Sequence, residues 1–463
     1  MSRETFQCIS PIDGAVVAER AYASDEEARQ HFLRAESSQH GWAEVSLLER
    51  VRLCKAATTA LLENSEEIAL ELTRQMGRPL RYGAGELRGF EERALAMCAL
   101  AEEALTPIQP PPREGFVRSI RRAPVGRVMV LSPWKYPYLT AVNAIIPALL
   151  AGNSVLLKHS EQTPLVAERL QQAFDAAGLP KGVFQHLFLS HAQLARLLAE
   201  RPADQVCFTG SVEGGRAVER ARAGTFAGLG LELGGQDAAY IAEDADLDAA
   251  VDGLIDGALF NSGQSCCGIE RIYIHRSHWV GFLERAIPLV ESYQLGDPRD
   301  KETTLGPLAR AAAAERLRRL IADAVSAGAT AHISAEPFPM SREGSAYLAP
   351  QLLSGVPREH PLRRDELFGP LALLEVVDDD EAAVRAINDS RYGLTAALWT
   401  NNIERAQRIA PQLEVGTVFM NRCDYLDPYL AWTGVKESGR GATLSRLAFE
   451  AMTRPQSLHF KQG

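Results

Sequence analysis

Residues 127–158 read RVMVLSPWKYPYLTAVNAIIPALLAGNSVLLK, and this stretch decides the fold class. Its three apolar segments, Val128–Leu131, Ala144–Leu150 and Ser154–Lys158, are short and follow one another closely, as strands alternating with helices do. Such alternation favours a parallel α/β sheet. The sequence therefore predicts that a parallel sheet begins at Arg127.

The alternation of strands and helices continues up to Gly234-Gly235 and begins again after it. Before it, two more strands with intervening helices are predicted, and after it the pattern repeats with a long helix at Ala311–Ala327. Two consecutive α/β domains fit this order best. The further strands are predicted at 182–188, 205–208, 272–275, 371–376 and 416–420.

The flanking regions differ in character from the α/β core. Residues 24–105 are dense in Ala, Leu, Glu and Arg and predict several helices, which Pro107 and Pro110-Pro111-Pro112 bring to an end. Phe116–Ile120 then begins an extended, arginine-rich segment that ends near Gly126 and predicts a projecting hairpin or arm.

Bulk properties exclude several classes of protein. The formal net charge of −10 over 463 residues argues against general affinity for nucleic acid or an anionic membrane, since either needs a concentrated basic surface. No secretory signal and no apolar run long enough to span a bilayer is present, and the seven cysteines are scattered. We therefore expect a cytoplasmic protein with reduced thiols.

The sequence Asn261-Ser262-Gly263-Gln264-Ser265-Cys266-Cys267-Gly268 places a thiol on a turn bracketed by glycines. An amphipathic pattern from Asp244 predicts a helix before it, and the alternating Arg271–His275 predicts a strand after it. A cysteine held between two rigid elements can be positioned for chemistry. Equally, Cys266 and Cys267 can be small core residues, as most free cysteines are.

Two of four further stretches follow predicted strands. Ser132–Pro137 lies where open α/β sheets place their ligands, although a proline-rich turn without a ligand fits as well. Lys158–Glu161 offers one donor and one acceptor for ribose hydroxyls, and surface charge is the alternative.

The other two stretches are rich in glycine. Phe208–Gly215 runs from a strand into a helix start whose free N–H groups suit a phosphate, with a plain helix cap as the alternative. Leu231–Gly235 surrounds Glu232 with apolar residues, so its pKa should rise and make it a usable general base. The alternative is a glutamate that points out of a strand end.

Taken in order, these stretches resemble the aldehyde dehydrogenase superfamily along nearly the whole chain. Seven pieces in register carry the resemblance: Pro133–Pro137, Phe208–Ser211, Glu232–Gly235, Gly263–Cys266, Asp365–Pro370, Tyr392–Leu394 and Gly434–Gly439. The resemblance implies two Rossmann-like α/β domains, one cofactor-binding and one catalytic, plus a small β oligomerisation arm. The implied boundaries are 1–112 and 126–234 for the NAD-binding domain, 235–445 for the catalytic domain, and 113–125 with 446–463 for the arm.

The resemblance also implies roles for individual residues. Cys266 would be the nucleophile that adds to an aldehyde, and Glu232 the base that activates the thiol or the hydrolytic water. No metal is implied. Because Glu161 would repel a 2′-phosphate, NAD is expected in preference to NADP. The implied cofactor contacts are Lys158 and Glu161 at the adenosine ribose, Gly210 and Ser211 at the pyrophosphate, Trp134 and Leu233 along the cleft, and Glu366 and Phe368 at the nicotinamide ribose and ring.

Three positions depart from the family pattern. Lys135 stands where the family usually carries an asparagine that donates to the oxyanion. An ammonium can stabilise an alkoxide and lower the thiol pKa, but it is longer, mobile and close to a nicotinamide cation. Gln236 and Ala442-Thr443 replace charged residues near the base.

Three functions follow from these observations. The first is an NAD-dependent dehydrogenase that hydrolyses its thioester to a carboxylic acid, as Glu232 favours. The second is an acylating enzyme that passes the thioester to coenzyme A. The third is a weakly active or non-catalytic relative, because of Lys135.

The substrate and the assembly are less defined. Arg422, in the loop expected to shape the aldehyde pocket, can pair with an acidic substrate or form a salt bridge with Asp424 or Asp427, and we favour the salt bridge. The aromatic residues Tyr136, Tyr138, Tyr425 and Trp432 suggest an apolar or aromatic aldehyde, with ordinary core residues as the alternative. The arm implies a homodimer or homotetramer.

Overall fold

The computed structural model describes residues 3–200 and 203–462, and places the quoted stretch at the centre of a six-stranded sheet. Strands β4 (Arg127–Ser132) and β5 (Ser154–His159) pair in parallel, and α5 (Pro137–Leu150) connects them. Ala144–Leu150 is the second half of this helix. The helix is buried on nearly every side, so its sequence shows a continuous apolar run and no amphipathic period.

The first sheet has the strand order β18-β8-β7-β4-β5-β6. Its strands are parallel except β18, which returns from late in the chain and pairs antiparallel with β8. The remaining strands are β6 (Phe184–His186), β7 (Gln205–Thr209), β8 (Gly228–Glu232) and β18 (Gly439–Arg440), and the connecting helices are α6 (Pro164–Ala176), α7 (His191–Ala199) and α8 (Val212–Arg222).

The N-terminal region confirms the predicted helices and adds a hairpin. The helices are α1 (Asp25–Glu44), α2 (Leu47–Leu62), α3 (Ser65–Met76) and α4 (Leu80–Leu105). Before them, β1 (Thr5–Ile9) and β2 (Val16–Ala21) form an antiparallel hairpin that the sequence analysis did not predict. Helices α2, α4 and α5 pack into the largest hydrophobic core, beneath the first sheet.

The second sheet has seven strands in the order β11-β12-β13-β10-β9-β15-β16, all parallel except β11. The strands are β9 (Asp237–Ile241), β10 (Ile269–His275), β11 (Thr330–Ala331), β12 (Gln351–Ser354), β13 (Leu371–Val377), β15 (Thr395–Trp399) and β16 (Thr417–Met420). The helices are α9 (Leu247–Leu259), α10 (Trp279–Glu291), α11 (Ala311–Ser326), α12 (Pro361–Arg364), α13 (Asp380–Asn388) and α14 (Ile403–Ile409). The predicted fold class, two α/β units in succession, is confirmed.

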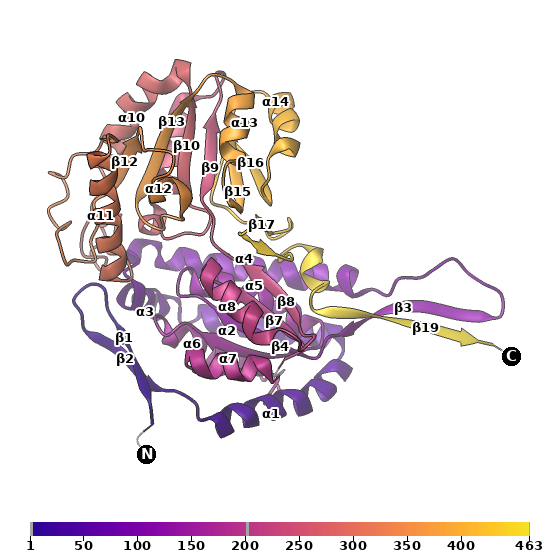
Figure 1. Cartoon of the computed structure of the whole chain (residues 1–463). Helices are drawn as coiled ribbons and strands as arrows, with labels where there is room; N and C mark the ends of the chain where they lie inside the picture. The colour runs from indigo at the N-terminus through magenta and orange to yellow at the C-terminus, as the bar shows by residue number, and fades with distance from the viewer. Residues whose placement is uncertain (1–2, 201–202, 463) are drawn as a thin grey trace.

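The predicted arm is a long two-stranded ribbon that projects from the body (Figure 1). β3 (Phe116–Pro124) pairs antiparallel with β19 (Thr453–Lys461) over its whole length. Near its tip, Val117 and the directly opposite Phe460 lie on one face of the ribbon and are 47% and 57% exposed. A second small sheet, β14 (Tyr392–Gly393) with β17 (Val435–Lys436), lies between the two units.

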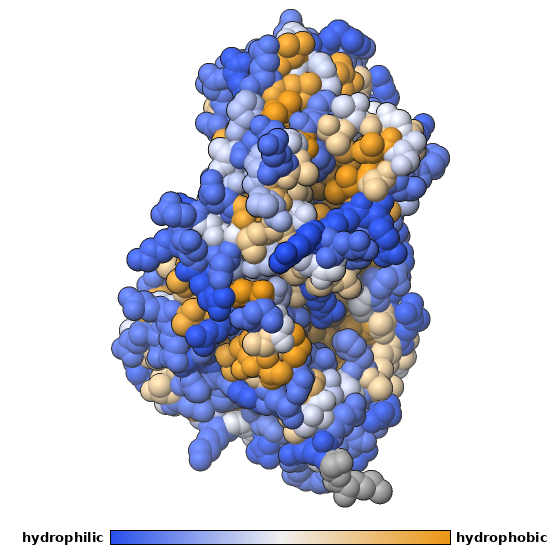
Figure 2. Space-filling view, turned by 90° about the vertical axis from the view of Figure 1, so that its left-hand side faces the viewer, coloured by the Kyte–Doolittle hydropathy of each residue, from blue (hydrophilic) through white to orange (hydrophobic). Residues whose placement is uncertain are grey.

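The rest of the surface is mostly polar. Figure 2 shows one face on which hydrophilic side chains predominate and hydrophobic patches are limited in extent. Among the helices of the described residues, none is both long and apolar enough to cross a membrane.

Candidate active site

The cysteine turn lies between the two units, after a helix and before a strand, as predicted. Helix α9 ends at Leu259, and Phe260–Gly263 forms a 3-10 turn in which Asn261 and Ser262 have positive φ angles of 53° and 55°. Gly263 also has positive φ, and a Cβ there would overlap the backbone of Gly369. Ser262 Oγ donates to Gly306 O at 2.9 Å. The turn is thus fixed by close backbone packing and hydrogen bonds.

Cys266 is surrounded by groups that favour its thiolate. A hydrogen bond from the Cys267 thiol and the adjacent Lys135 ammonium hold the pKa of Cys266 well below its usual range, although burial acts in the opposite direction. At other free thiols burial is the largest effect: it raises the pKa values of Cys8, Cys207 and Cys423 to about 12. Among the free cysteines of the described residues, Cys266 is therefore the one whose surroundings favour the thiolate.

The single proton of the Cys267 thiol has two possible acceptors, the Cys266 thiolate and the Asp424 carboxylate. Its Sγ donates to Asp424 Oδ1 at 2.9 Å, and Ser265 Oγ donates to the same oxygen at 3.2 Å. Burial raises the pKa of Asp424 to about 7. A protonated Asp424 is a weaker acceptor than the carboxylate, so the Cys267 proton is then more available to the Cys266 thiolate. Asp424 and Cys267 thus form a hydrogen-bonded network next to Cys266.

Lys135 occupies the turn between β4 and α5 and is 5% exposed. Tyr136, which caps the helix, adopts a left-handed conformation (φ 44°), and this strained backbone directs the preceding lysine into the site. Burial would lower the pKa of Lys135, but Cys266 and Glu366 outweigh that effect and raise it. Its Nζ lies 5.9 Å from the centre of the Phe368 ring. Lys135 is therefore a buried, charged ammonium.

A cavity of about 370 Å³ leads to Cys266 from one side. Lys135, Cys266, Cys267 and Asp424 line its inner end, and helix α4 supplies much of its wall. The lining includes Arg88 and Arg93 of this helix and Arg78 from the loop before it, which is ion-paired with Glu86 in a fully buried position. Arg93 Nη1 donates to Leu139 O at 2.7 Å and Asn143 Oδ1 at 3.2 Å, so its guanidinium is fixed near Cys266 and Glu232.

Glu232 ends β8 and lines a separate, smaller cavity near Cys266. Burial raises the pKa of Glu232, in the predicted direction, while hydrogen bonds from Thr443 and Thr209 oppose the shift. Thr209 Oγ1 donates to Glu232 Oε2 at 3.0 Å. Thr443, one of the noted departures, therefore holds the carboxylate with a hydroxyl.

A third cavity of about 450 Å³ opens beside β4, β5 and β7 at their carboxyl ends. Six predicted cofactor residues line it: Trp134, Lys158, Gly210, Ser211, Glu366 and Phe368. Ser211 caps α8 and accepts from Gly214 N at 3.1 Å, so the helix N-terminus faces this cavity. The lining thus combines polar groups that suit a dinucleotide with an aromatic ring. They are the Lys158 ammonium, the Glu366 carboxylate, the N-terminus of α8 and the Trp134 indole. Lys135 lines both this cavity and the one that leads to Cys266.

The other two predicted cofactor residues lie outside this lining. Leu233 is buried in a hydrophobic cluster with Val212, Leu231 and Tyr392, and its backbone N–H donates to Ser438 O at 2.9 Å. Glu161 lies beside Lys158, close enough for their charges to interact.

The predicted salt bridge of Arg422 is wrong. Arg422 is exposed, and its guanidinium carbon stacks 4.0 Å from the centre of the Tyr425 ring. Asp424, one of its predicted partners, instead turns inward to Ser265 and Cys267, with a positive φ of 49°. The inward turn buries the carboxylate and leaves the arginine in solvent.

Sequence reasoning missed three contributors to the site. Asp424 and Arg93 reach it from segments far from the cysteine turn. Glu270 is a buried carboxylate that accepts from the backbone N–H groups of Leu367 and Phe368 at 2.9 Å each, and so positions the segment carrying Glu366. The one available signal was Glu270 itself, a carboxylate in an otherwise apolar strand.

Comparisons with known proteins agree with this geometry. The model of the aldehyde dehydrogenase family matches residues 1–458. The chain is 32% identical to a succinate-semialdehyde dehydrogenase [NADP(+)] of Deinococcus radiodurans, covering 97% of this chain and 93% of that protein. It is 30% identical to the succinate semialdehyde dehydrogenase [NAD(P)+] Sad of Escherichia coli (strain K12), covering 97% and 96%. The solved structure of PnpE in complex with nicotinamide adenine dinucleotide superposes with a TM-score of 0.93 at 29% identity, covering 99% and 94%.

Proposed function

Because this chain belongs to the aldehyde dehydrogenase family, we propose that it oxidises an aldehyde to the carboxylic acid with NAD and water. One observation carries the proposal. Cys266, with its depressed pKa, lines one cavity, and Lys135 lines both that cavity and the one bordered by the predicted cofactor residues.

The first step is addition to the carbonyl. The Cys266 thiolate forms a bond to the carbonyl carbon, the π electrons move to oxygen, and a thiohemiacetal alkoxide results. Lys135 lies next to Cys266 and supplies the positive charge that the alkoxide needs. The negative charge moves from sulfur to oxygen beside the same cation.

NAD would be held by Trp134, Lys158, Ser211, Glu366 and Phe368, and when bound it accepts the hydride that leaves the former aldehyde carbon. Lys158 is buried and presents an ammonium at the ribose end of the cavity. Glu270 fixes the backbone on either side of Leu367, which positions Glu366 and Phe368. The resulting acyl group remains on Cys266 as a thioester.

Hydrolysis requires a base, and Glu232 supplies it. Its raised pKa makes the carboxylate a better proton acceptor than an exposed glutamate, and Thr209 and Thr443 hold its orientation. Glu232 takes a proton from water, the hydroxide adds to the thioester, and the Cys266 thiolate leaves as the acid is released. A positioned base favours water over coenzyme A as the acyl acceptor.

NAD is proposed as the preferred cofactor because the Glu161 carboxylate lies beside Lys158, where it would repel a 2′-phosphate. The two named relatives use NADP(+) or NAD(P)+, so the ratio of kcat/KM values for the two cofactors is the quantity to measure.

For the substrate, short aldehydes with a distal carboxylate are the first to test. The named relatives act on succinate semialdehyde, and three arginines line the Cys266 cavity. Arg88, which is exposed and lies toward the solvent side of this wall, is the arginine most accessible to an incoming carboxylate. Truncation of Arg88 to alanine should raise KM for succinate semialdehyde and leave that for an uncharged aldehyde unchanged.

One experiment separates the candidate functions. NADH formation is followed with anionic, aliphatic and aromatic aldehydes, with and without coenzyme A, in the wild type, Cys266→Ala and Lys135→Asn. The proposal expects turnover without coenzyme A that Cys266→Ala abolishes. Dependence on coenzyme A identifies an acylating enzyme, and NAD binding without turnover of any aldehyde rejects both enzymatic functions.

We further propose that the chain forms a homodimer or a dimer of dimers through the β3–β19 ribbon, whose free edges and exposed apolar residues suit pairing. Light scattering that shows only monomer at micromolar concentration contradicts this assembly.

A further inference from the structure

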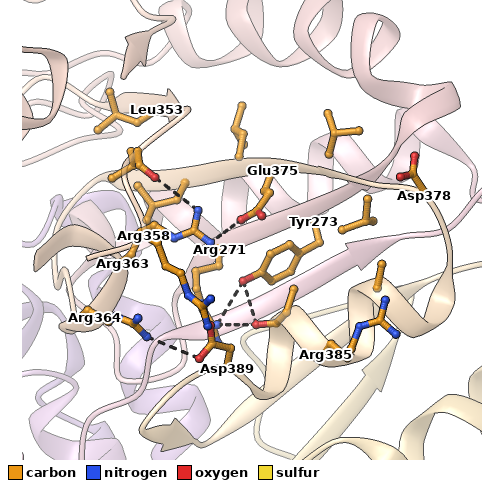
Figure 3. Close-up of a pocket in the computed structure, with 17 residues that line it drawn as sticks. Arg271, Tyr273, Leu353, Arg358, Arg363, Arg364, Glu375, Asp378, Arg385 and Asp389 are labelled. Carbon is orange, nitrogen blue, oxygen red and sulfur yellow. Dashed lines mark hydrogen bonds and ion pairs between the residues drawn. The ribbon is translucent and has the colours of Figure 1, made fainter. Parts of the chain in front are cut away.

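A separate cavity of about 510 Å³ lies on the seven-stranded sheet and shares no lining residue with the two cavities next to Lys135. Its lining includes Arg271 and Tyr273 of β10, which Figure 3 shows, and Leu373 of β13. Its walls come from α12, the loop before α12, and α13. We call it the arginine cavity.

The lining has more cations than anions. Five guanidinium groups face three carboxylates: Arg271, Arg358, Arg363, Arg364 and Arg385 against Glu375, Asp378 and Asp389. The whole chain has the opposite balance, with 59 acidic and 49 basic residues. The local excess of positive charge is therefore a property of this cavity and not of the composition.

The carboxylates neutralise this lining incompletely. Arg358 lies 3.0 Å and Arg364 3.6 Å from the two oxygens of Asp389, and Arg364 also pairs at 2.9 Å with Glu359, which is outside the lining. Asp378 pairs at 2.6 Å with Arg276, which is outside the lining. Arg358 and Arg364 thus retain hydrogen-bond donors for a further anion.

Arg385 supplies a second cationic position. It is exposed, and within residues 3–200 and 203–462 it makes no ion pair. Figure 3 shows it on the side of Tyr273 away from Arg364. Between these positions the floor is the Tyr273 ring with Leu373 and Ala386.

We propose that the arginine cavity binds a small organic molecule with two separated anionic groups, either carboxylates or phosphates. One group accepts hydrogen bonds from Arg358 and Arg364, and the other from Arg385. The connecting carbons lie on Tyr273 and Leu373. The planar guanidinium fork matches both kinds of anion, and the volume suits a small metabolite.

The cavity is connected to the segment that carries Glu366. Arg271 Nε donates to Gln236 O at 2.9 Å, and Gln236 Nε2 donates to Asp365 O at 2.9 Å. Arg364 of the cavity wall immediately precedes Asp365. An anion bound by Arg364 therefore contacts the chain two residues from Glu366.

Isothermal titration calorimetry of the full chain tests the proposal. The protein is saturated with NAD and alkylated at Cys266, which blocks the cofactor cavity and the thiol, and the Arg88→Ala variant reports any binding of the probe in the Cys266 cavity. The probes are succinate, glutarate and adipate as dicarboxylates, fructose 1,6-bisphosphate as a bisphosphate, and acetate as a monoanion. Binding of a dianion but not of acetate is expected, and the better series identifies the anion type.

Variants locate any binding. Arg385→Ala and Arg358→Ala should each weaken the dianion at least about tenfold, while Arg385→Lys should retain part of the affinity. Arg285→Ala is the matched control, because Arg285 pairs with Asp248 outside the cavity and should leave binding unchanged. Since Arg385 has no ion pair in the described chain, its loss should not lower the thermal unfolding midpoint. Binding by no probe at millimolar concentration, or equal binding by Arg385→Ala and wild type, overturns the proposal.

Discussion

Replacement of Lys135 by methionine should remove the charge that keeps Cys266 ionised. Methionine preserves the length and volume of the buried side chain but cannot donate a hydrogen bond. The pKa of Cys266 is lowered first by the Cys267 hydrogen bond and then by Lys135, while burial opposes both. Without Lys135, burial is opposed by the Cys267 hydrogen bond alone, and the pKa of Cys266 must rise.

The size of the increase in the Cys266 pKa can be worked out from its charge interaction with Lys135. Two unit charges about 4 Å apart at an effective dielectric constant of about 20 interact by ~4 kcal/mol, which corresponds to about three pKa units. The upper limit is set by the other buried thiols of this chain, Cys8, Cys207 and Cys423, whose pKa values burial raises to about 12. At neutral pH, alkylation of Cys266 should therefore slow by about a hundredfold or more.

The assay is the rate of Cys266 alkylation by iodoacetamide as a function of pH, read by mass spectrometry of the peptide containing the residue. In the wild type the rate should already be at its plateau near neutral pH, because the thiolate persists down to the depressed pKa. In Lys135→Met the rate should still be rising at pH 9.

Lys301→Met serves as the control, since Lys301 is exposed and remote from the lining residues. An unchanged pH–rate profile in Lys135→Met would refute the assigned role of the ammonium. A loss of steady-state turnover with unchanged alkylation would restrict Lys135 to the oxyanion.

Three further outcomes are expected. Glu232→Gln should keep a first-turnover burst of NADH in stopped-flow traces but lower the steady-state rate by about a hundredfold or more, and equal loss in both phases would contradict its role in hydrolysis. Glu161→Ala should raise kcat/KM for NADP relative to NAD by about tenfold or more, since it removes a like charge from the 2′-phosphate position. Glu86→Gln should lower the free energy of unfolding by about 3–5 kcal/mol in urea, because it leaves Arg78 buried and unpaired. The matched exposed change Glu213→Gln should cost about 1 kcal/mol or less, and similar values for both would show that the Arg78 pair is not special.

The parts of the fold that sequence predicted well are those whose burial imposes a pattern. β4 and β5 are central parallel strands covered on both faces, so they appear as continuous apolar runs. The β1–β2 hairpin lies at the periphery and only alternate residues are buried, which leaves a weak apolar signal. Its turn at Pro11-Ile12-Asp13-Gly14 was the available clue.

The residues of the site also differ in how far the sequence could predict them. Residues on local turns, such as Cys266 and Lys135, are identifiable because the turn sequence itself is unusual. The partners of these residues are set by tertiary distance: Cys267 and its acceptor Asp424 are separated by 157 positions in sequence. The sequence therefore singled out Cys266 but assigned Asp424 to the wrong partner, Arg422.

The geometry also changes the argument about Lys135. As a substitute for an amide donor, an ammonium is unfavourable when it is mobile and uncompensated. Here it is buried, held between Cys266 and Glu366, and charged because of those neighbours. Burial raises the pKa of Glu366 to about 7, so this carboxyl can lose or keep its proton as the local charge changes. An amide can stabilise only the alkoxide that follows addition, whereas a fixed cation also stabilises the thiolate that precedes it. The cation lowers the barrier to addition only by the amount by which it stabilises the alkoxide more than the thiolate. Lys135 should therefore increase the fraction of reactive Cys266 more than it lowers the barrier to addition.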